Sequence, residues 1–252
     1  MRVLRTFVKP AHGAAMREAE SVTLRAGHGI VGDVSVACNS PRQVLFASEP
    51  VYRRLGLEPG ALRENFLVDG EIESFASGQV LRVGPEVQVR LTIPCEPCAK
   101  LNRVRPGLAR QVAGHRGFLG RVVAGGVVRA GHGVVLSEAV FPPMPLRPRE
   151  RVYELVSRIP AGRVLGYRAL VRTLGLTRTY VRVIPRFLAA APAGVPVHRV
   201  VTTEGVLVER HVPEQARLLR AEGVPMTRAK RVRDSALWDP TEYFGPELLP
   251  AG

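Results

Sequence analysis

A proline-rich stretch in the middle of the chain, Phe141 to Pro148, limits how these 252 residues can fold. Four of its eight residues are proline, which lacks a backbone N–H and biases the preceding residue away from helix. Such a stretch forms a stiff, extended spacer. We therefore predict two domains, residues 1–140 and 149–240, joined by a linker at 141–148 and followed by a C-terminal tail at 241–252.

The N-terminal part has the sequence pattern of a β-rich domain. Clusters of β-forming residues between glycine-containing turns predict strands at 80–83, 87–91 and 134–136. Segments 49–55 and 107–113 predict short helices. The pattern indicates a mostly antiparallel β-barrel with few helices, so we expect an α+β chain of two domains.

Short motifs in this part follow the order found in the MOSC family. They are Gly29–Asp33, Arg42–Val44, Arg63–Phe66, Gly78–Gly84, Pro97–Asn102, Arg116–Gly117 and Val123–Gly126. From about Val3 to Ser137 the chain thus resembles MOSC domains, which are β-rich and proposed to carry sulfur or bind the molybdenum cofactor. The resemblance implies that Cys98 is the cysteine of that family.

Cys98 is the candidate catalytic residue of the first domain, and the candidate metal ligand for molybdenum. A thiolate there could hold sulfur as a persulfide or ligate the molybdenum cofactor, which are both soft-ligand roles. The cations at Lys100, Arg103 and Arg105 would favour the thiolate and an anionic cofactor. A buried, inert cysteine is the alternative. Cys95 adds a Cys-x-x-Cys spacing, but the sequence lacks a second pair, which argues against zinc.

The C-terminal part contains three further motifs in a fixed order. They are Val152–Leu170 with an Ile-Pro-x-Gly turn, Pro196-Val197-His198-Arg199-Val200, and Leu218–Val224. From about Arg149 to Pro240 this part resembles the O6-alkylguanine-DNA alkyltransferases. The resemblance implies a helical, winged helix-turn-helix-like domain that binds DNA.

The nucleophile of the alkyltransferases is replaced in this chain. Their signature is Pro-Cys-His-Arg-Val, and Val197 stands at the cysteine position. Valine has no lone pair and no titrating proton, so we predict no alkyl transfer, as in the alkyltransferase-like branch of the family. His198 and Glu222 match the pair that activates the cysteine, and here we expect a structural hydrogen-bonded pair. The lesion-pocket candidates are Pro196, Val197, His198, Arg199 and Glu222.

Arginine dominates the region around these motifs. Positions 155–203 contain eight arginines and no Asp or Glu, a composition that suits a polyanion such as DNA. The alternative is a compositional bias of the genome, because 33 of the 36 basic residues in the chain are arginine. The DNA-binding candidates are Tyr167, Arg168, Arg172, Arg178, Arg182 and Arg186. By resemblance, Tyr167 helps to rotate the target nucleotide and Arg182 fills the vacated stack, with Arg178 or Arg186 as alternatives for that role.

Local patterns predict how these side chains are presented. Positions 168–174 predict a short helix, and Gly175 to Thr177 a turn, with Thr177 as the N-cap candidate of the next helix. In that helix Arg178, Arg182 and Arg186 would share one face because they recur every four residues. Pro185 lies inside it and predicts a kinked or shortened helix.

Composition agrees with an acidic partner and a reducing compartment. The net charge is +14, of which residues 1–145 contribute +6 and residues 146–252 contribute +8. No apolar run approaches a membrane span, and the N-terminus lacks the apolar core of a signal peptide. Three cysteines, of which Cys38 has no readable role, argue against a disulfide framework. We expect a cytoplasmic, nucleoid-associated protein without membrane partners.

Two hypotheses for function follow. In the first, the protein binds double-stranded DNA, flips O6-alkylguanine lesions without repairing them, and flags them for nucleotide excision repair proteins. In the second, the MOSC-like domain works as a sulfur-carrying or molybdenum-cofactor-binding enzyme, and the second domain is an accessory that binds DNA.

Overall fold

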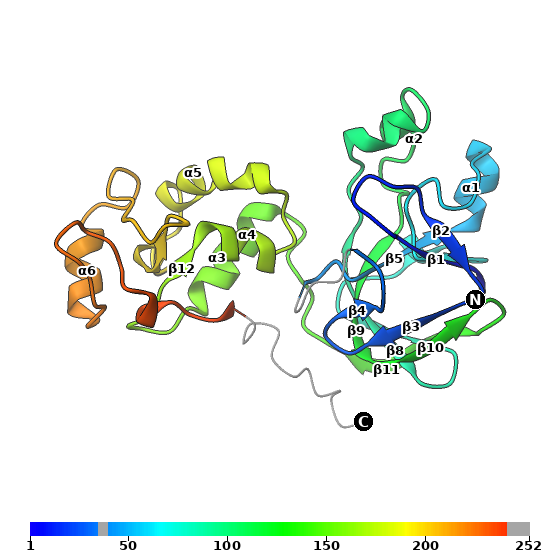
Figure 1. The fold of residues 1–252 in the computed structure, drawn as a ribbon, viewed down its shortest axis with the longest axis horizontal. Helices are drawn as coiled ribbons and strands as arrows, with labels where there is room; N and C mark the ends of the chain where they lie inside the picture. Colours follow the sequence, from blue (N-terminus) through cyan, green and yellow to red (C-terminus); the bar gives the residue numbers. More distant parts are fainter. Residues whose placement is uncertain (35–39, 241–252) are drawn as a thin grey trace. The chain divides into compact units, whose positions relative to one another are not determined.

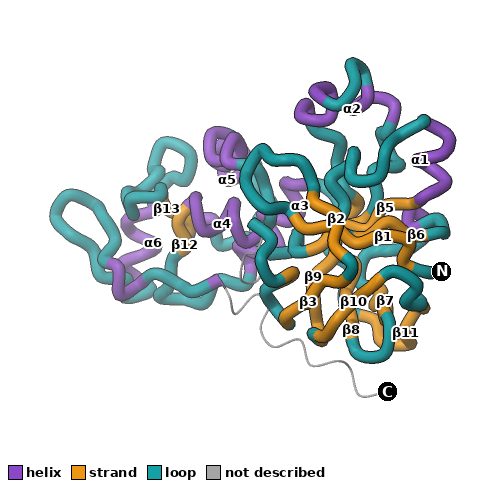
Figure 2. Tube along the Cα trace, turned by 45° about the vertical axis from the view of Figure 1, so that its right-hand side comes forward, coloured by secondary structure: helices purple, strands orange, loops and turns teal. Residues whose placement is uncertain are grey.

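The computed structural model describes residues 1–34 and 40–240, and within this range the chain divides into two compact units, residues 1–144 and residues 145–240 (Figure 1). Strands gather in the first unit, whereas the second unit consists mostly of helices and loops (Figure 2). The predicted two-domain α+β class is therefore confirmed. Cys38 and the predicted tail lie outside the described residues.

A curled sheet dominates the first unit. In the described part of the chain it has eight strands, in the spatial order β11 (Val134–Val140), β7 (Gln79–Val83), β8 (Val87–Pro94), β9 (Phe118–Ala124), β5 (Val44–Ser48), β6 (Phe66–Val68), β1 (Val3–Val8) and β2 (Arg17–Ala19). Only β5 and β6 pair in parallel among these neighbours. A small second sheet joins β10 (Gly126–Arg129), β3 (Ser21–Arg25) and β4 (Gly29–Ile30).

Backbone hydrogen bonds connect the beginning of β1 to the beginning of β11. The Val134 N–H donates to the Met1 carbonyl at 2.7 Å, and the Val3 N–H donates to the His132 carbonyl at 2.9 Å. These bonds bring the first strand of the chain against the last strand of the curled sheet. The predicted mostly antiparallel barrel is therefore confirmed, and the barrel is held at this seam by a short contact.

Both faces of β5 are buried, which explains its continuous apolar run. One face contributes to the barrel core, where the rings of Phe46 and Phe66 lie 4.9 Å apart. The other face is covered by α1 (Glu49–Leu55), the 3-10 helix η2 (Ala99–Arg103) and α2 (Leu108–Gln111). The two helices predicted for this part are thus present.

Two of the MOSC-like motifs hold strands together. Gln43 is 1 % exposed, and its amide accepts from the Val122 N–H at 2.9 Å and donates to the Gly27 carbonyl at 2.5 Å. Gly29 has φ +107°, and a Cβ there would lie 3.1 Å from the Gln43 Cβ. The buried Asn65 accepts from the Leu45 N–H at 3.0 Å. These polar residues are therefore part of the barrel framework.

The second unit packs helices around a short parallel strand pair. The helices are α3 (Pro148–Ser157), α4 (Tyr167–Thr173), α5 (Ile184–Ala189) and α6 (Gln215–Ala221), and the strands are β12 (Leu165–Gly166) and β13 (Val200–Val201). Residues of α3, α4 and α5 share one apolar core with Trp238. The prediction of a helical C-terminal domain is confirmed, as is the short helix predicted at 168–174. Among the described residues, no helix has the length and apolar character that crossing a membrane requires.

The segment after α4 differs from the prediction. Instead of one helix, it forms the 3-10 helix η3 (Arg178–Arg182) and then α5, which has Pro185 in its first turn. Proline is tolerated there because the first turn has no partner for its missing N–H. A 3-10 helix has three residues per turn, so residues four apart do not align. The prediction that the three arginines share one helical face was therefore wrong. The prediction that Pro185 shortens the helix was correct.

The first half of the proline-rich stretch packs on the first unit. The Phe141 N–H donates to the Gly78 carbonyl at 2.8 Å, and the Met144 N–H donates to the Ser77 hydroxyl at 2.8 Å. The guanidinium of Arg90 lies 5.0 Å from the centroid of the Phe141 ring. Phe141 and Met144 are both buried. Residues 141–144 therefore belong to the first unit, and α3 already begins at Pro148. The extended spacer is thus shorter than predicted.

Candidate nucleic-acid interface and cysteine site

The Pro-Val-His-Arg-Val motif forms a tight turn that leads into a strand. It contains the 3-10 helix η4 (Val197–Arg199), which continues directly into β13. In the parallel pair Leu165 lies opposite Val200, and Gly166 lies opposite Val201. Because the pair is parallel, the motif turn lies beside the residues that precede β12, and the segment after β13 lies beside the start of α4. Val197 packs against the same apolar core that contains Tyr167.

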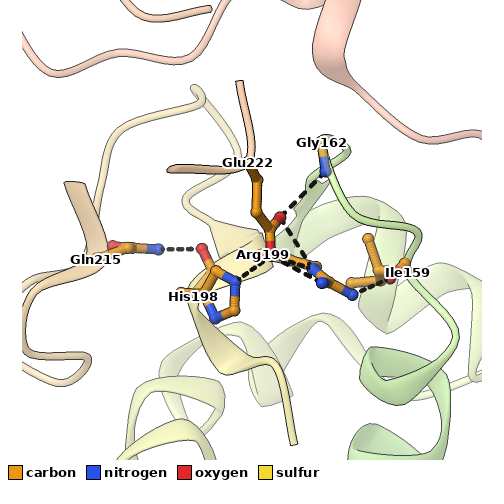
Figure 3. A network of polar contacts seen from close by, with 6 residues as sticks. All are labelled: Ile159, Gly162, His198, Arg199, Gln215 and Glu222. Atoms are coloured by element: carbon orange, nitrogen blue, oxygen red, sulfur yellow. Dashed lines mark hydrogen bonds and ion pairs between the residues drawn. The ribbon is translucent and has the colours of Figure 1, made fainter. Parts of the chain in front are cut away.

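Glu222 ties this turn to two other parts of the second unit (Figure 3). Its Oε1 accepts from His198 Nε2 at 2.7 Å and from Arg199 Nη2 at 2.7 Å. Its Oε2 accepts from the Gly162 N–H at 3.1 Å, and Arg199 Nη1 donates to the Ile159 carbonyl at 2.7 Å. One carboxylate therefore joins the motif turn, the end of α6 and the Ile-Pro-x-Gly turn.

The network fixes the charge of this carboxylate. Burial alone would raise the pKa of Glu222, but hydrogen bonds from Arg199, His198 and the Gly162 N–H outweigh it and lower the pKa to about 2. Both oxygens of Glu222 are occupied by protein donors. The predicted His198–Glu222 hydrogen bond is present, and Arg199 holds the same carboxylate from the other side.

Sequence reasoning missed Gln215, which is fully buried. Its Nε2 donates to the His198 carbonyl at 3.0 Å and to the Val200 carbonyl at 2.7 Å, and its Oε1 accepts from the Val208 N–H at 2.5 Å. Gln215 therefore fixes the backbone on both sides of Arg199. The available signal was its position four residues before Leu219, which places both on the inner face of α6.

Tyr167 is buried at the start of α4, with 5 % of the residue exposed. Burial raises its pKa to about 12, so the phenol is neutral at physiological pH. Within the described residues its hydroxyl is buried without a hydrogen-bond partner. Buried hydroxyls are normally hydrogen-bonded, so this unsatisfied group is a candidate for contact with a ligand.

The five candidate DNA-binding arginines are all exposed. Arg168 and Arg172 lie on α4, Arg178 and Arg182 on η3, and Arg186 on α5. No ion pair joins any of them to an acidic group in the described parts of the chain. The elements after β12 therefore present a surface of uncompensated positive charge.

The two described cysteines of the first unit differ in accessibility. Cys95 follows β8 and is buried, and its N–H donates to the Gly117 carbonyl at 2.8 Å. Burial raises the pKa of Cys95, which Arg116 and Arg42 counteract. Cys98 directly precedes η2 and is only half-buried. Cys98 is therefore the thiol that a reagent or cofactor can reach more easily.

A group of cations gathers around Lys9 in the same unit. Burial and the neighbouring charge of Arg63 lower the pKa of Lys9, while Asp33 opposes this and Lys100 and Arg116 add to it. These side chains are therefore close enough to act on one another, and they suit an anionic group.

The cysteine site offers few protein ligands. The described residues contain no group of three His, Cys, Asp or Glu side chains that could hold a metal ion. The accessible thiol of Cys98 would therefore suit a cofactor that brings most of its other ligands with it. Arg105 departs from the prediction, because its guanidinium binds the Leu55 carbonyl at 2.8 Å and Gln111 Oε1 at 2.6 Å.

Two family models match the chain. The model of the MOSC domain matches residues 37–135, and the model described as the DNA-binding domain of 6-O-methylguanine DNA methyltransferase matches residues 147–224. The chain contains a MOSC domain followed by a methyltransferase-type DNA-binding domain. The matched part of the DNA-binding domain includes the complete Glu222 network and all five candidate arginines.

Solved structures also resemble parts of the chain. YiiM from Geobacillus stearothermophilus is 16 % identical, with a TM-score of 0.46, and the match covers 74 % of this chain and 98 % of YiiM. The Atl1 protein of S. pombe, in complex with damaged DNA containing O6-carboxymethylguanine, is 26 % identical, with a TM-score of 0.31. That match covers 36 % of this chain and 93 % of Atl1. Comparison with curated proteins gives no match.

Proposed function

We propose that the DNA-binding domain recognises O6-alkylguanine in double-stranded DNA and holds it without removing the alkyl group. The observation that carries this proposal is that the motif turn has no nucleophile at position 197 and that Glu222 is hydrogen-bonded through both oxygens. Val197 stands where a nucleophile would be needed, and Arg199 and the Gly162 N–H occupy Glu222 together with His198. The turn is therefore held by several hydrogen bonds, and position 197 lacks an atom that could accept an alkyl group.

The exposed arginines would supply affinity for the duplex. Each phosphate contact releases counterions and adds affinity that does not depend on sequence. Extruding a base costs a few kcal/mol, and less for a poorly paired one. Arg182, on the exposed 3-10 helix, would fill the vacated stack and offset part of that cost.

Tyr167 would act inside the pocket rather than on the DNA surface. Its hydroxyl is buried and has no partner within the described residues, and its side chain shares a core with Val197. An extruded base that reached this hydroxyl would offer it a hydrogen bond. The buried position also limits how far Tyr167 could reach toward the DNA backbone without moving.

A protein that binds a lesion and leaves it unchanged acts as a marker. The bound complex would attract proteins of nucleotide excision repair, which remove the damaged strand. For such a role we expect the protein in the cytoplasm, at the nucleoid.

The second candidate function belongs to the MOSC domain. The half-buried Cys98, two residues before Lys100, favours a sulfur-carrying or molybdenum-cofactor-binding role, with the DNA-binding domain as an accessory. In this case Cys98 would carry persulfide sulfur or ligate molybdenum, and the neighbouring cations would bind the anionic part of the cofactor.

A binding comparison tests the two proposals. Duplexes that differ by a single O6-methylguanine are titrated with the full-length protein at several salt concentrations. Clearly tighter binding of the damaged duplex supports the first proposal, and equal affinity for both overturns it. Molybdenum content and cyanolysable sulfur, measured on the same wild-type preparation and on Cys98→Ser, test the second proposal. Equal values in both preparations would overturn the role of Cys98.

A further inference from the structure

A short hairpin follows the residues matched by the DNA-binding domain model, which end at Val224. In this hairpin the Thr227 N–H donates to the Arg231 carbonyl at 2.8 Å, and Met226 and Val232 form an antiparallel bridge. In Figure 1 it is the orange-red loop that follows α6. Hydrogen bonds thus close the loop and give it a defined shape.

The hairpin is attached to the sheet that positions the motif turn. The Val232 N–H donates to the Gly205 carbonyl at 2.9 Å, and Val206 forms an antiparallel bridge with Arg231. The Val206 segment follows β13 after a tight turn, in which the Gly205 N–H donates to the Thr202 carbonyl at 3.0 Å. The hairpin is therefore fixed relative to β13, and through β12 to the start of α4.

Positive charge is concentrated on this hairpin. Arg228, Lys230, Arg231 and Arg233 are all exposed, whereas Val232 between them is buried and anchors the strand. Lys230 Nζ lies 2.6 Å from Glu209 Oε2. Within the described residues, the three arginine side chains form no ion pair. Three guanidinium groups on a hydrogen-bonded support are thus available for an external anion.

We propose that this hairpin is a second DNA-contacting surface, which binds backbone phosphates to one side of the site that holds the lesion. The inference rests on the proposed DNA binding of the domain. Arginine binds phosphate oxygens through paired N–H donors, and contacts of this kind position a protein without reading sequence. A duplex held by the arginines of α4, η3 and α5 would meet the hairpin at a high effective concentration.

The experiment removes the three unpaired charges together and keeps the Lys230–Glu209 pair. The full-length variant Arg228→Ala/Arg231→Ala/Arg233→Ala is titrated with undamaged and O6-methylguanine duplexes over a range of salt concentrations. We expect the slope of log K against log salt to fall by about 0.9 for each lost phosphate contact, and so by at most about 2.7. The ratio of damaged to undamaged affinity should stay unchanged.

A matched variant separates position from net charge. Arg17→Ala/Arg25→Ala/Arg82→Ala removes the same charge from exposed sites of the MOSC domain, and its slope should equal that of the wild type. Replacing the three hairpin arginines with lysine should keep most of the wild-type slope. Equal slopes for the hairpin triple variant and the MOSC triple variant would overturn the proposal. A hairpin variant that loses only the preference for damage would also overturn it.

Two further measurements complete the test. Hydroxyl-radical footprinting of the triple variant should show loss of protection on one flank only. If the triple variant melts earlier than the wild type, the single change Arg228→Ala at the exposed turn should still lower the slope by about 0.9. Failure of the proposed function looks different, because the wild type would then bind both duplexes equally while the hairpin still changed the salt slope. Binding of an acidic peptide with no change in the DNA slope would assign the hairpin to a protein partner and overturn the DNA contact.

Discussion

Arg199 and Glu222 form a side-on ion pair in which Arg199 Nε lies 3.1 Å from each carboxylate oxygen and Nη2 lies 2.7 Å from Oε1. The two side chains are only 18 % and 17 % exposed. The pair therefore holds the motif turn against α6 with a geometry that a single point contact could not provide.

Removal of the guanidinium should weaken the fold. Arg199→Met leaves Glu222 partly buried with fewer donors, and we expect the free energy of unfolding to fall by roughly 2–3 kcal/mol. Arg158→Met, which breaks an exposed pair with Glu154, is the control and should cost less than about 1 kcal/mol. Urea titrations measure both values, and similar losses in the two variants would contradict the central role of Arg199.

The same carboxylate should make stability depend on pH in the acidic range. Because its pKa in the folded protein is lowered to about 2, Glu222 contributes stability that is complete above its ordinary pKa of 4.5 and is lost as the pH falls toward 2. Wild type should therefore be more stable than Glu222→Gln at pH 6, and the difference should shrink steadily below about pH 4.5. Urea unfolding at pH 6, 4 and 3 tests this, and a constant difference would count against it.

Wild-type protein should not accept alkyl groups. After incubation with an O6-methylguanine duplex, intact mass spectrometry should show unmodified protein, because Val197 offers no nucleophilic atom. Val197→Cys supplies a thiol at the same place and serves as the comparison, with gain of a single methyl expected. A stoichiometric methyl gain on the wild type would show that another residue reacts.

The candidate DNA-binding residues should divide into two functional groups. Arg182→Ala and Tyr167→Phe should lower the ratio of damaged to undamaged binding, because they remove the stacking group and the buried hydroxyl. Arg172→Ala should weaken both duplexes similarly and lower the salt slope by about 0.9. Titrations of both duplexes decide this. If Arg182→Ala behaves like Arg172→Ala, Arg178 or Arg186 becomes the candidate for filling the stack.

Cys98 should react before Cys95 with a thiol reagent near neutral pH. Cys95 is buried and its pKa is raised, so less thiolate is present and access is poor. Peptide mapping after brief alkylation should find Cys98 modified first, and Cys95 only once the protein is unfolded. Cys98→Ser is the control and should show little early labelling of Cys95. Equal early labelling of both thiols would favour the alternative that Cys98 is an inert cysteine.

Local signals predicted much of the fold. The β-forming clusters became β7, β8 and β11, and the segment at 168–174 became α4, because hydrophobic periodicity and turn residues act over short distances. The segment at 178–186 failed as a single helix because the start of α5 at Ile184 lets Pro185 occupy a first turn, a local choice that a four-residue spacing does not encode.

Contacts over long sequence distances were harder to predict. The His198–Glu222 pair came from the family resemblance, but the role of Arg199 as the main donor depends on where Ile159 and Gly162 lie in space. The linker was drawn too long because proline content outweighed the two apolar residues within it, Phe141 and Met144, whose side chains found buried sites.

That docking determines where a pulling force between the two domains would act. Phe141 follows directly after β11, but its backbone is bonded to Gly78 and that of Met144 to Ser77, before β7. Tension on the chain would break these two bonds, and the bond from Arg90 Nη2 to the Pro142 carbonyl at 2.6 Å, before it reached the strand pairing of the barrel. Residues 141–144 would then join the tether between the domains and span at most about 3.3 Å each. If the DNA-binding domain were attached to moving or bending DNA, the tether could thus lengthen while the barrel stayed folded.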